Sequence, residues 1–171
     1  TTMDAGYGSS PWLRRALVKF DLTSISSYVH VNSSQVSLYP ASFYQAGGLT
    51  ISVHRVQQSP TRPWTEGGVT WNKYDGTNSW TTAGGDFGAA TSQTAVSSTG
   101  QYYNWTVTAD SQNFVQTPST NYGWIFKSTA EASSYAAAFS TKESTTNKPK
   151  LYVTYISSPY DIVGKTWSGG L

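Results

Sequence analysis

The sequence predicts an all-β fold, a jelly-roll β-sandwich that carries one short helix. Three observations lead to this fold class: apolar and polar residues alternate in many short segments, turn-rich stretches separate these segments, and only one segment has helical spacing. Many short strands joined by turns are typical of two-layer β-sandwiches. We expect one domain over residues 1–156 and a tail over residues 157–171.

In the first half of the chain, the clearest strand pattern covers residues 15–22, where every second side chain is apolar. Residues 36–38 and 49–53 repeat this alternation. The Ala-Gly-Gly sequence at residues 46–48 predicts a turn between these last two strands.

In the second half of the chain, residues 110–116 have the spacing of a short helix, with Phe114 and Val115 facing the core. Thr108 or Asp110 is the expected N-cap, because short polar side chains accept hydrogen bonds from the first free amides of a helix. Further strands are predicted over residues 102–107, 123–127, 136–139 and 151–156.

The block at residues 64–87 combines three tryptophans, a tyrosine and a phenylalanine with glycines and short polar residues. The only regular element that it can hold is a strand over residues 69–71. We expect Trp64 and Trp71 to be buried pegs, because tryptophan side chains bury a large apolar area. Glu66 is expected to cap backbone amides of its own loop.

The composition is typical of an extracellular or cell-surface β-protein. Charged residues make up 12% of the chain and aromatic residues 15%, whereas charged residues are usually about 25%. The net charge of +2 is too small to indicate a nucleic-acid partner, and no apolar run is long enough to predict membrane insertion. The chain has no cysteine, so it has neither a disulfide nor a catalytic thiolate.

Several motifs occur in a fixed order along most of the chain. They are G-S-S at residues 8–10, R-x-L-x-K-F-D-L at 15–22, W-x-E-x-x-V-T-W at 64–71, W-x-x-x-G-G-D-F at 80–87, F-S-x-K-E at 139–143 and K-P-x-L-x-V-x-Y at 148–155. In these motifs the chain resembles the DNRLRE family, also called the disaggregatase-related domain, which is grouped with carbohydrate-binding modules. The resemblance implies a jelly-roll sandwich on secreted or surface proteins, without catalysis of its own, and alginate binding in some members.

The two ends of the chain depart from this family pattern. Members begin with a strand before the G-S-S motif, and the resemblance implies that this first strand is missing here. Beyond Tyr155 the chain continues with a strand-like tail, whose candidate donor residues are Tyr160, Ile162, Val163 and Trp167. A sandwich that lacks a strand leaves an open edge, which we expect beside the predicted strands at 15–22 and 151–156.

The tail has three interpretations. Insertion into the next copy gives a head-to-tail homopolymer, insertion into the same molecule gives a circularly permuted monomer, and a tail that inserts nowhere is an interdomain linker. The leading functional hypothesis is a non-catalytic structural or adhesive subunit that assembles by strand donation into an extracellular filament or surface matrix. The alternative is a carbohydrate-binding module of a secreted polysaccharide-active enzyme, with an acidic, alginate-like polysaccharide as its ligand.

Sugar binding requires aromatic faces that stack on pyranose C–H groups, and basic side chains that pair with uronate carboxylates. The candidate carbohydrate-binding residues are Trp12, Arg14, Arg15, Lys73, Tyr74, Trp80, Tyr102 and Tyr103.

Catalytic chemistry is not indicated. The nine carboxylates are dispersed, and neither His30 nor His54 has a partner at a spacing typical of a metal site or a catalytic triad. We expect both histidines at the surface or at strand edges, and we expect no enzyme activity and no required cofactor.

The sequence also offers a candidate calcium site and two candidate glycosylation sites. Clustered side-chain oxygens are the ligands that Ca²⁺ prefers, so a structural calcium ion is a possibility at Asp75, Asn78 and Asp86, although a plain β-turn explains the first two as well. Asn32 and Asn104 begin N-x-S/T glycosylation sequons.

Overall fold

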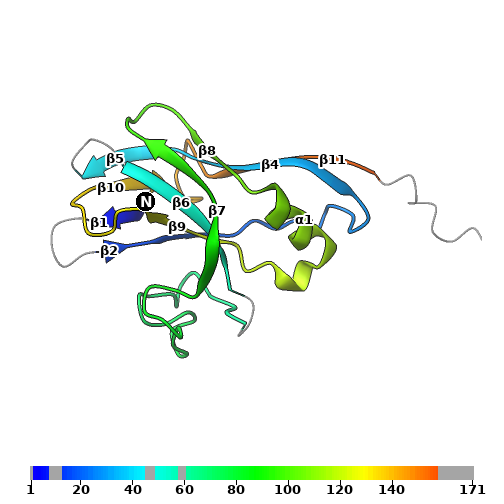
Figure 1. Cartoon of the computed structure of the whole chain (residues 1–171), viewed down its shortest axis with the longest axis horizontal. Coiled ribbons are helices and arrows are strands. Elements are labelled where there is room, and N and C mark those ends of the chain that lie inside the picture. Colours follow the sequence, from blue (N-terminus) through cyan, green and yellow to red (C-terminus); the bar gives the residue numbers. More distant parts are fainter. Residues whose placement is uncertain (1, 8–12, 45–48, 58–60, 158–171) are drawn as a thin grey trace, which may run out of the picture.

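The computed structural model describes residues 2–7, 13–44, 49–57 and 61–157, which form a β-sandwich (Figure 1). This confirms the predicted all-β class with one short α-helix. The elements in chain order are β1 (Thr2–Tyr7), β2 (Leu13–Arg14), β3 (Ala16–Val18), β4 (His30–Leu38), β5 (Pro40–Tyr44), β6 (Leu49–Val56), β7 (Phe87–Val96), β8 (Tyr103–Thr106), α1 (Thr108–Gln116), the 3₁₀ turn η1 (Pro118–Thr120), β9 (Trp124–Ser128), β10 (Ala136–Ser140) and β11 (Lys150–Ile156).

The strands form three antiparallel sheets with the orders β2-β1-β10-β5, β11-β4-β8 and β3-β9-β6-β7. Tyr39 alone separates β4 from β5, so the first two sheets share one long strand and together make one layer of the sandwich. The third sheet makes the other layer. The long connection from β6 to β7 projects from the sandwich as a lobe (Figure 1); we call residues 61–86 the aromatic loop.

Aromatic side chains fill the core between the layers. The Trp105 ring packs edge-to-face on Phe126 and Phe139, with ring centroids 5.2 and 6.0 Å apart. Its indole N–H donates to the carbonyl of Ile51 at 2.8 Å, so burial of this ring leaves no unpaired donor.

Helix α1 confirms the predicted helix, and Phe114 and Val115 are fully buried. The predicted N-cap is wrong: the N-cap residue is Val107, which has no side-chain capping bond. The two polar candidates make tertiary bonds instead. The Thr108 hydroxyl accepts from a β4 amide, and the Asp110 carboxylate accepts from the indole of Trp124. Of the helices in the described residues, none is long and apolar enough to cross a membrane.

The strand predicted over residues 15–22 forms only over Ala16–Val18, and the chain changes layer just before it. Leu13–Arg14 pairs with β1 in one layer, and Ala16–Val18 pairs with β9 in the other. The strand predicted over residues 69–71 does not form. Within the aromatic loop, the only ladder contact in the described part is an isolated bridge between Lys73 and Ser79.

Four strands were not predicted: β1, β2, β5 and β7. Strand β7 (Phe87–Val96) has no alternating apolar pattern from which it could be predicted, because most of its side chains are exposed or half-buried on both faces. Strand β1 requires a correction to the expected missing strand, because Thr2–Tyr7 already forms one between β2 and β10. However, β1 pairs with the outer edge of β10 and does not extend to β11. In the described residues, the outer edge of β11 pairs with no strand.

Candidate functional site

A groove of about 750 Å³ lies beside the aromatic loop. Consecutive residues 13–21, which include β2 and β3, line one part of it, and the aromatic loop lines another. Lys142 and Pro149 also contribute. Ligands usually bind in mostly apolar concavities that carry a few polar groups, which makes this groove the candidate site.

A buried ion pair holds the aromatic loop together. The Asp86 carboxylate accepts from Arg62 Nε at 2.5 Å and from the amides of Thr81 and Thr82 at 2.8 Å each. Burial alone would raise the pKa of Asp86, but the Thr81 amide, the guanidinium and the Thr82 amide together lower it. The carboxylate therefore stays charged and ties the two ends of the loop to each other.

Two tryptophans anchor the loop to the outer face of the β3-β9-β6-β7 sheet. Trp80 is only 6% exposed and packs in one cluster with Ile125, and its indole donates to the carbonyl of Thr70 at 3.0 Å. Trp64 is half-buried against the same cluster and donates to the carbonyl of Tyr122 at 2.7 Å. Trp64 anchors the loop as expected but is half-buried rather than buried, and Trp80 is a second peg rather than a stacking platform.

Trp71 is not the buried peg that the sequence predicted. It is 37% exposed and lines the groove. The Arg15 guanidinium lies 5.0 Å from the ring centroid and occupies the space that the ring would need in order to be buried. The Gly84 amide donates to the Trp71 carbonyl at 2.6 Å. Gly84 has a φ of +91°, and a Cβ there would lie 2.7 Å from the Trp71 ring, so this position requires glycine.

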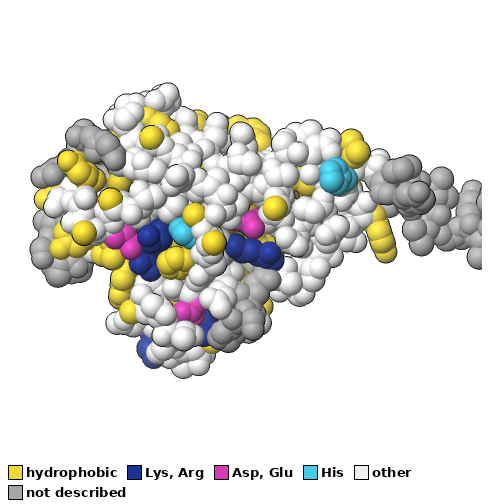
Figure 2. Space-filling view, viewed as in Figure 1, with side chains coloured by type: hydrophobic (Ala, Val, Ile, Leu, Met, Phe, Trp, Pro, Cys, Tyr) yellow, Lys and Arg dark blue, Asp and Glu magenta, His cyan; other side chains and the backbone are white. Residues whose placement is uncertain are grey.

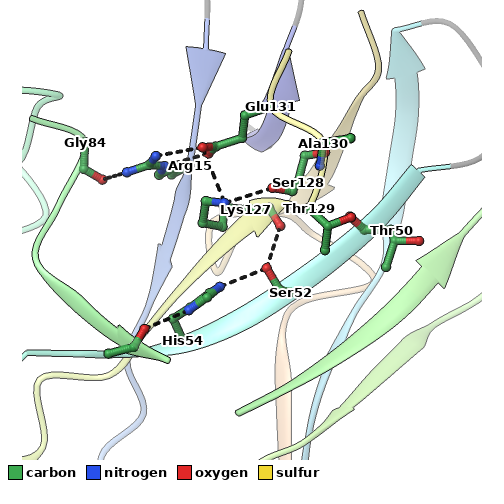
Figure 3. Close-up of polar contacts among 11 residues, drawn as sticks. Arg15, Thr50, Ser52, His54, Gly84, Lys127, Ser128, Thr129, Ala130 and Glu131 are labelled. Carbon is green, nitrogen blue, oxygen red and sulfur yellow. Dashed lines mark hydrogen bonds and ion pairs between the residues drawn. The ribbon is translucent and has the colours of Figure 1, made fainter. Parts of the chain in front are cut away.

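Arg15 is itself fixed by a network beneath the loop (Figure 3). Its Nε and Nη2 donate to the two carboxylate oxygens of Glu131 at 2.7 and 2.8 Å, and Nη1 donates to the Gly84 carbonyl at 3.0 Å. Lys127 lies 3.3 Å from the same carboxylate. Burial works to raise the pKa of Glu131, but Arg15 and Lys127 lower it overall. Arg15 therefore positions Trp71 and is not available to pair with a ligand anion.

Basic side chains also lie at the rim of the groove. Arg14 forms an ion pair with Asp4, and Lys142 Nζ lies 2.7 Å from Glu66. Lys19 is exposed and lines the groove. The expected capping role of Glu66 is wrong, because its exposed carboxylate reaches across to Lys142 instead of turning back to its own loop.

The remaining loop candidates do not line the groove. The Tyr74 ring packs on Trp80, with centroids 5.6 Å apart, and on the Arg62 guanidinium at 5.4 Å. Lys73 donates to the Thr77 carbonyl at 2.6 Å. Both side chains therefore help to shape the loop.

Tyr102 and Tyr103 lie apart from the groove, at the start of β8. The Lys150 ammonium lies 4.3 Å from the Tyr102 ring centroid, and the phenol donates to the Lys148 carbonyl at 3.2 Å. Of the predicted sugar-binding residues, the structure thus brings Arg14, Arg15 and Trp80 to one groove, and Trp80 is buried there. Trp12, Tyr160, Ile162, Val163 and Trp167 lie outside the described residues.

The predicted calcium ligands belong to two separate bonding arrangements. The Asp75 carboxylate accepts from the Thr77 amide at 2.9 Å and from the Asn78 amide and side chain at 2.6 and 2.7 Å, as in a plain turn. Asp86 pairs with Arg62 instead. In residues 2–7, 13–44, 49–57 and 61–157, no three His, Cys, Asp or Glu side chains group as metal ligands. The calcium site stays a prediction.

The sequon residues Asn32 and Asn104 are both exposed, on β4 and β8. The Asn104 side-chain oxygen accepts from the Ser37 hydroxyl at 2.5 Å. Glycosylation at either residue stays a prediction.

The two histidines differ in environment. His30 is exposed, as expected, but His54 is buried in the central strand β6, so its expected surface or edge position is wrong. Its Nδ1 lies 2.9 Å from the Gly88 carbonyl and its Nε2 lies 2.9 Å from the Ser52 hydroxyl. Burial lowers the pKa of His54, and the charges of Lys127 and Arg15 add to this.

Charged side chains are sparse on the face of the molecule that Figure 2 shows. They gather where the lobe of the aromatic loop meets the sandwich, and most of the surrounding surface is uncharged. On this face, the charged groups available to a ligand therefore lie mainly beside the loop.

A β-sandwich with an aromatic groove suits a carbohydrate-binding module. A scan against family models agrees: carbohydrate-binding module family 96 matches residues 3–155, and the chain belongs to this family. The narrower DNRLRE resemblance stays a prediction. A search of curated proteins finds no match to the chain.

Proposed function

We propose that the groove beside the aromatic loop binds a polysaccharide, with Trp71 as the stacking platform. The observation that carries this proposal is an exposed tryptophan held rigidly in a groove of a carbohydrate-binding module. An aromatic face packs well on the C–H face of a pyranose ring, and burial of both surfaces is favourable.

The support beneath Trp71 suits this role. The Arg15 guanidinium and the glycine at residue 84 fix the ring before any ligand arrives. Because little side-chain freedom remains to be lost, stacking costs less conformational entropy than it would on a mobile ring.

The rim favours an acidic polysaccharide such as an alginate-like glycan. Arg14, Lys19 and Lys142 can each face a uronate carboxylate along an extended chain. Two of them already pair with protein carboxylates, so a uronate would replace Asp4 or Glu66 as the partner. Exposed charges are screened by salt, and binding of an acidic polysaccharide should weaken as salt rises.

The context of the module is part of the same proposal. A carbohydrate-binding module is a non-catalytic domain, and we place it outside the cell, attached to or acting beside a polysaccharide-active enzyme. Its contribution there is to keep that enzyme on its polymer.

Affinity electrophoresis with alginate and with a neutral glucan tests the proposal. Trp71→Ala should weaken alginate binding about tenfold or more, which corresponds to roughly 1.4 kcal/mol. Tyr28→Ala is the matched control, because Tyr28 is an exposed aromatic residue that does not line the groove. Unchanged binding in Trp71→Ala would contradict the proposal, and equal binding of both glycans at all salt concentrations would contradict the acidic preference.

Self-assembly into a filament was the leading expectation from the sequence. The family match supports the carbohydrate-binding alternative and gives no support to assembly, which stays a prediction.

A further inference from the structure

Strand β11 has an unusually open edge. In the described residues it pairs with β4 on one side only, over all seven of its residues. Tyr152, Tyr155 and Ile156 are exposed, and the strand sequence KLYVTYI carries its single charge at the first position. Long apolar strand edges without protecting charges or prolines readily add another strand.

The other edges near it are better protected. Strands β2 and β3 are only two and three residues long. Strand β7 lies against β8, where the Thr94 hydroxyl donates to the Asn104 carbonyl at 2.6 Å. The open edge of β11 is therefore not a general property of this sandwich.

Strands β10 and β11 lie on the same side of the long β4–β5 strand. The carbonyl of Ser34 accepts from Val107, just after β8, whereas the carbonyl of Tyr39 accepts from Ser140 in β10. Because successive carbonyls of a strand point to opposite sides, positions 34 and 39 face opposite neighbours. Strand β10 thus lies opposite β8, on the side that β11 occupies.

Among the described residues, no strand lies beside the outer edge of β11. Strand β1 covers the outer edge of β10 and begins at Thr2, opposite Ser140. Farther along, Leu151 and Val153 pack against the core but remain half-buried, whereas Val36, the ladder partner of Leu151, is fully buried. A strand added here would continue the line of β1 and cover these side chains.

We propose that residues 160–167 of a second copy of this chain add as a strand to β11, antiparallel to it. The tail supplies what the edge requires, because Tyr160 and Ile162 alternate on one face and no proline follows Pro159. The side chains of Leu151 and Val153 would then lie beneath a continuous sheet.

If the tail added to β11 of its own chain, a tight turn would have to connect the two strands. The sequence does not suit such a turn, which favours a second copy as the source of the added strand. A two-residue turn at Ser157 and Ser158 would bring Ile162 opposite Val153, but such turns require glycine, asparagine or aspartate. A three-residue turn would shift the register by one and point Asp161 and Lys165 at the core. A strand from another molecule meets neither obstacle. Repetition of this contact from copy to copy gives an open chain of subunits.

Two variants of the full-length chain test the proposal. The donor variant Tyr160→Asp/Ile162→Asp places charge on the inserting face of the tail. The acceptor variant Tyr155→Lys places charge at the edge of β11, at an exposed position whose change leaves the core intact. Asp161→Asn is the matched control for the donor, because it alters the opposite face of the tail.

Sedimentation velocity over a concentration series measures the oligomeric state of each variant. The parent chain and Asp161→Asn should form oligomers that grow with concentration, and the donor and acceptor variants should each be monomeric. A mixture of the two variants should form a dimer and stop there, because it contains one working tail and one working edge. Circular dichroism checks that each variant is folded.

Two outcomes would overturn the proposal. A monomeric parent chain with β11 amides protected from hydrogen exchange would assign the tail to its own molecule. A monomeric parent chain with unprotected β11 amides would exclude strand addition altogether. Neither result would bear on polysaccharide binding, which Trp71 tests separately.

Discussion

At the scale of single residues, a few buried polar contacts determine the shape of the groove. Arg15 has an acceptor for each of its guanidinium nitrogens and supports Trp71 from below. Arg62 and Asp86 close the base of the aromatic loop with a pair that water hardly reaches. Removing one member of a buried pair leaves an uncompensated charge, whereas exposed pairs contribute little.

Arg62→Ala should therefore lower the free energy of unfolding by about 3 kcal/mol, because it leaves the Asp86 carboxylate buried without its counter-charge. Arg14→Ala, which breaks an exposed pair, should cost less than about 1 kcal/mol. Urea unfolding of the two variants measures both values. Equal losses would show that the loop does not depend on the buried pair.

His54 should make stability fall as the pH drops below about 7. Its pKa in the folded protein is lowered by burial, so the unfolded chain takes up a proton first as the pH falls. The stability contribution of the neutral ring is present above the unfolded pKa of about 6.5 and is lost below it. His54→Gln should flatten this part of the pH profile of the unfolding free energy, and an unchanged slope would assign the titration elsewhere.

Tyr103 should ionise near neutral pH. Its phenol oxygen receives the amides of Ser97 and Ser98 and the Gln101 side-chain amide, at 3.2, 3.0 and 2.9 Å. Bonds from the Ser97 and Ser98 side chains and amides lower the pKa of Tyr103 to about 7, because they favour the phenolate.

Absorbance at 295 nm during a pH titration should show one tyrosine ionising near pH 7, and Tyr103→Phe should remove that step. Since the pKa is lowered by folding, the stabilisation grows as the pH rises from about 7 and is complete above about 10. A titration with no step below pH 9 would refute the assignment.

At the scale of elements, what the sequence predicts depends on periodicity. Strands β6, β8, β9, β10 and β11 and helix α1 follow from alternating or helical apolar patterns and form as expected, whereas only the end of β4, at residues 36–38, was predicted. Strand β7 could not be predicted in this way, because nearly all of its side chains are exposed or half-buried and they follow no regular alternation of apolar and polar residues. The break at Arg15 depends on pairing with two different sheets, which no local pattern encodes.

The aromatic loop shows the same limit for the candidate site. Its tryptophans are obvious in the sequence, but their roles depend on contacts with distant residues. Trp80 is buried against Ile125, and Trp71 is kept at the surface by Arg15. The sequence therefore predicts a core position for Trp71, which lies exposed in the groove, and a ligand-binding role for Trp80, which is buried.

Gly84→Ala should disturb this loop without unfolding the sandwich. A Cβ at this position would meet the Trp71 ring and the Arg15 side chain, and a φ of +91° is unfavourable for alanine. We expect polysaccharide affinity to fall severalfold while cooperative unfolding persists. Gly88→Ala is the control, since a Cβ there has open space around it. Equal affinities of the two variants would contradict the positioning role of the glycine at residue 84.

At the scale of the whole molecule, the sandwich presents two distinct surfaces. The groove beside the aromatic loop suits a polysaccharide, and the open edge of β11 suits a strand of another copy. The two surfaces involve different residues, so a subunit that uses both would bind its polymer at many points. Linked sites bind more tightly than single ones when the geometry allows simultaneous contact.

The most direct measurement is an NMR titration of the tryptophan indole N–H signals with alginate oligosaccharides. The Trp71 signal should shift to saturation, whereas the signals of Trp105 and Trp124, which are fully buried in the core, should not. Saturable binding that leaves the Trp71 signal in place would contradict the central claim that this ring in the groove is the sugar-binding platform.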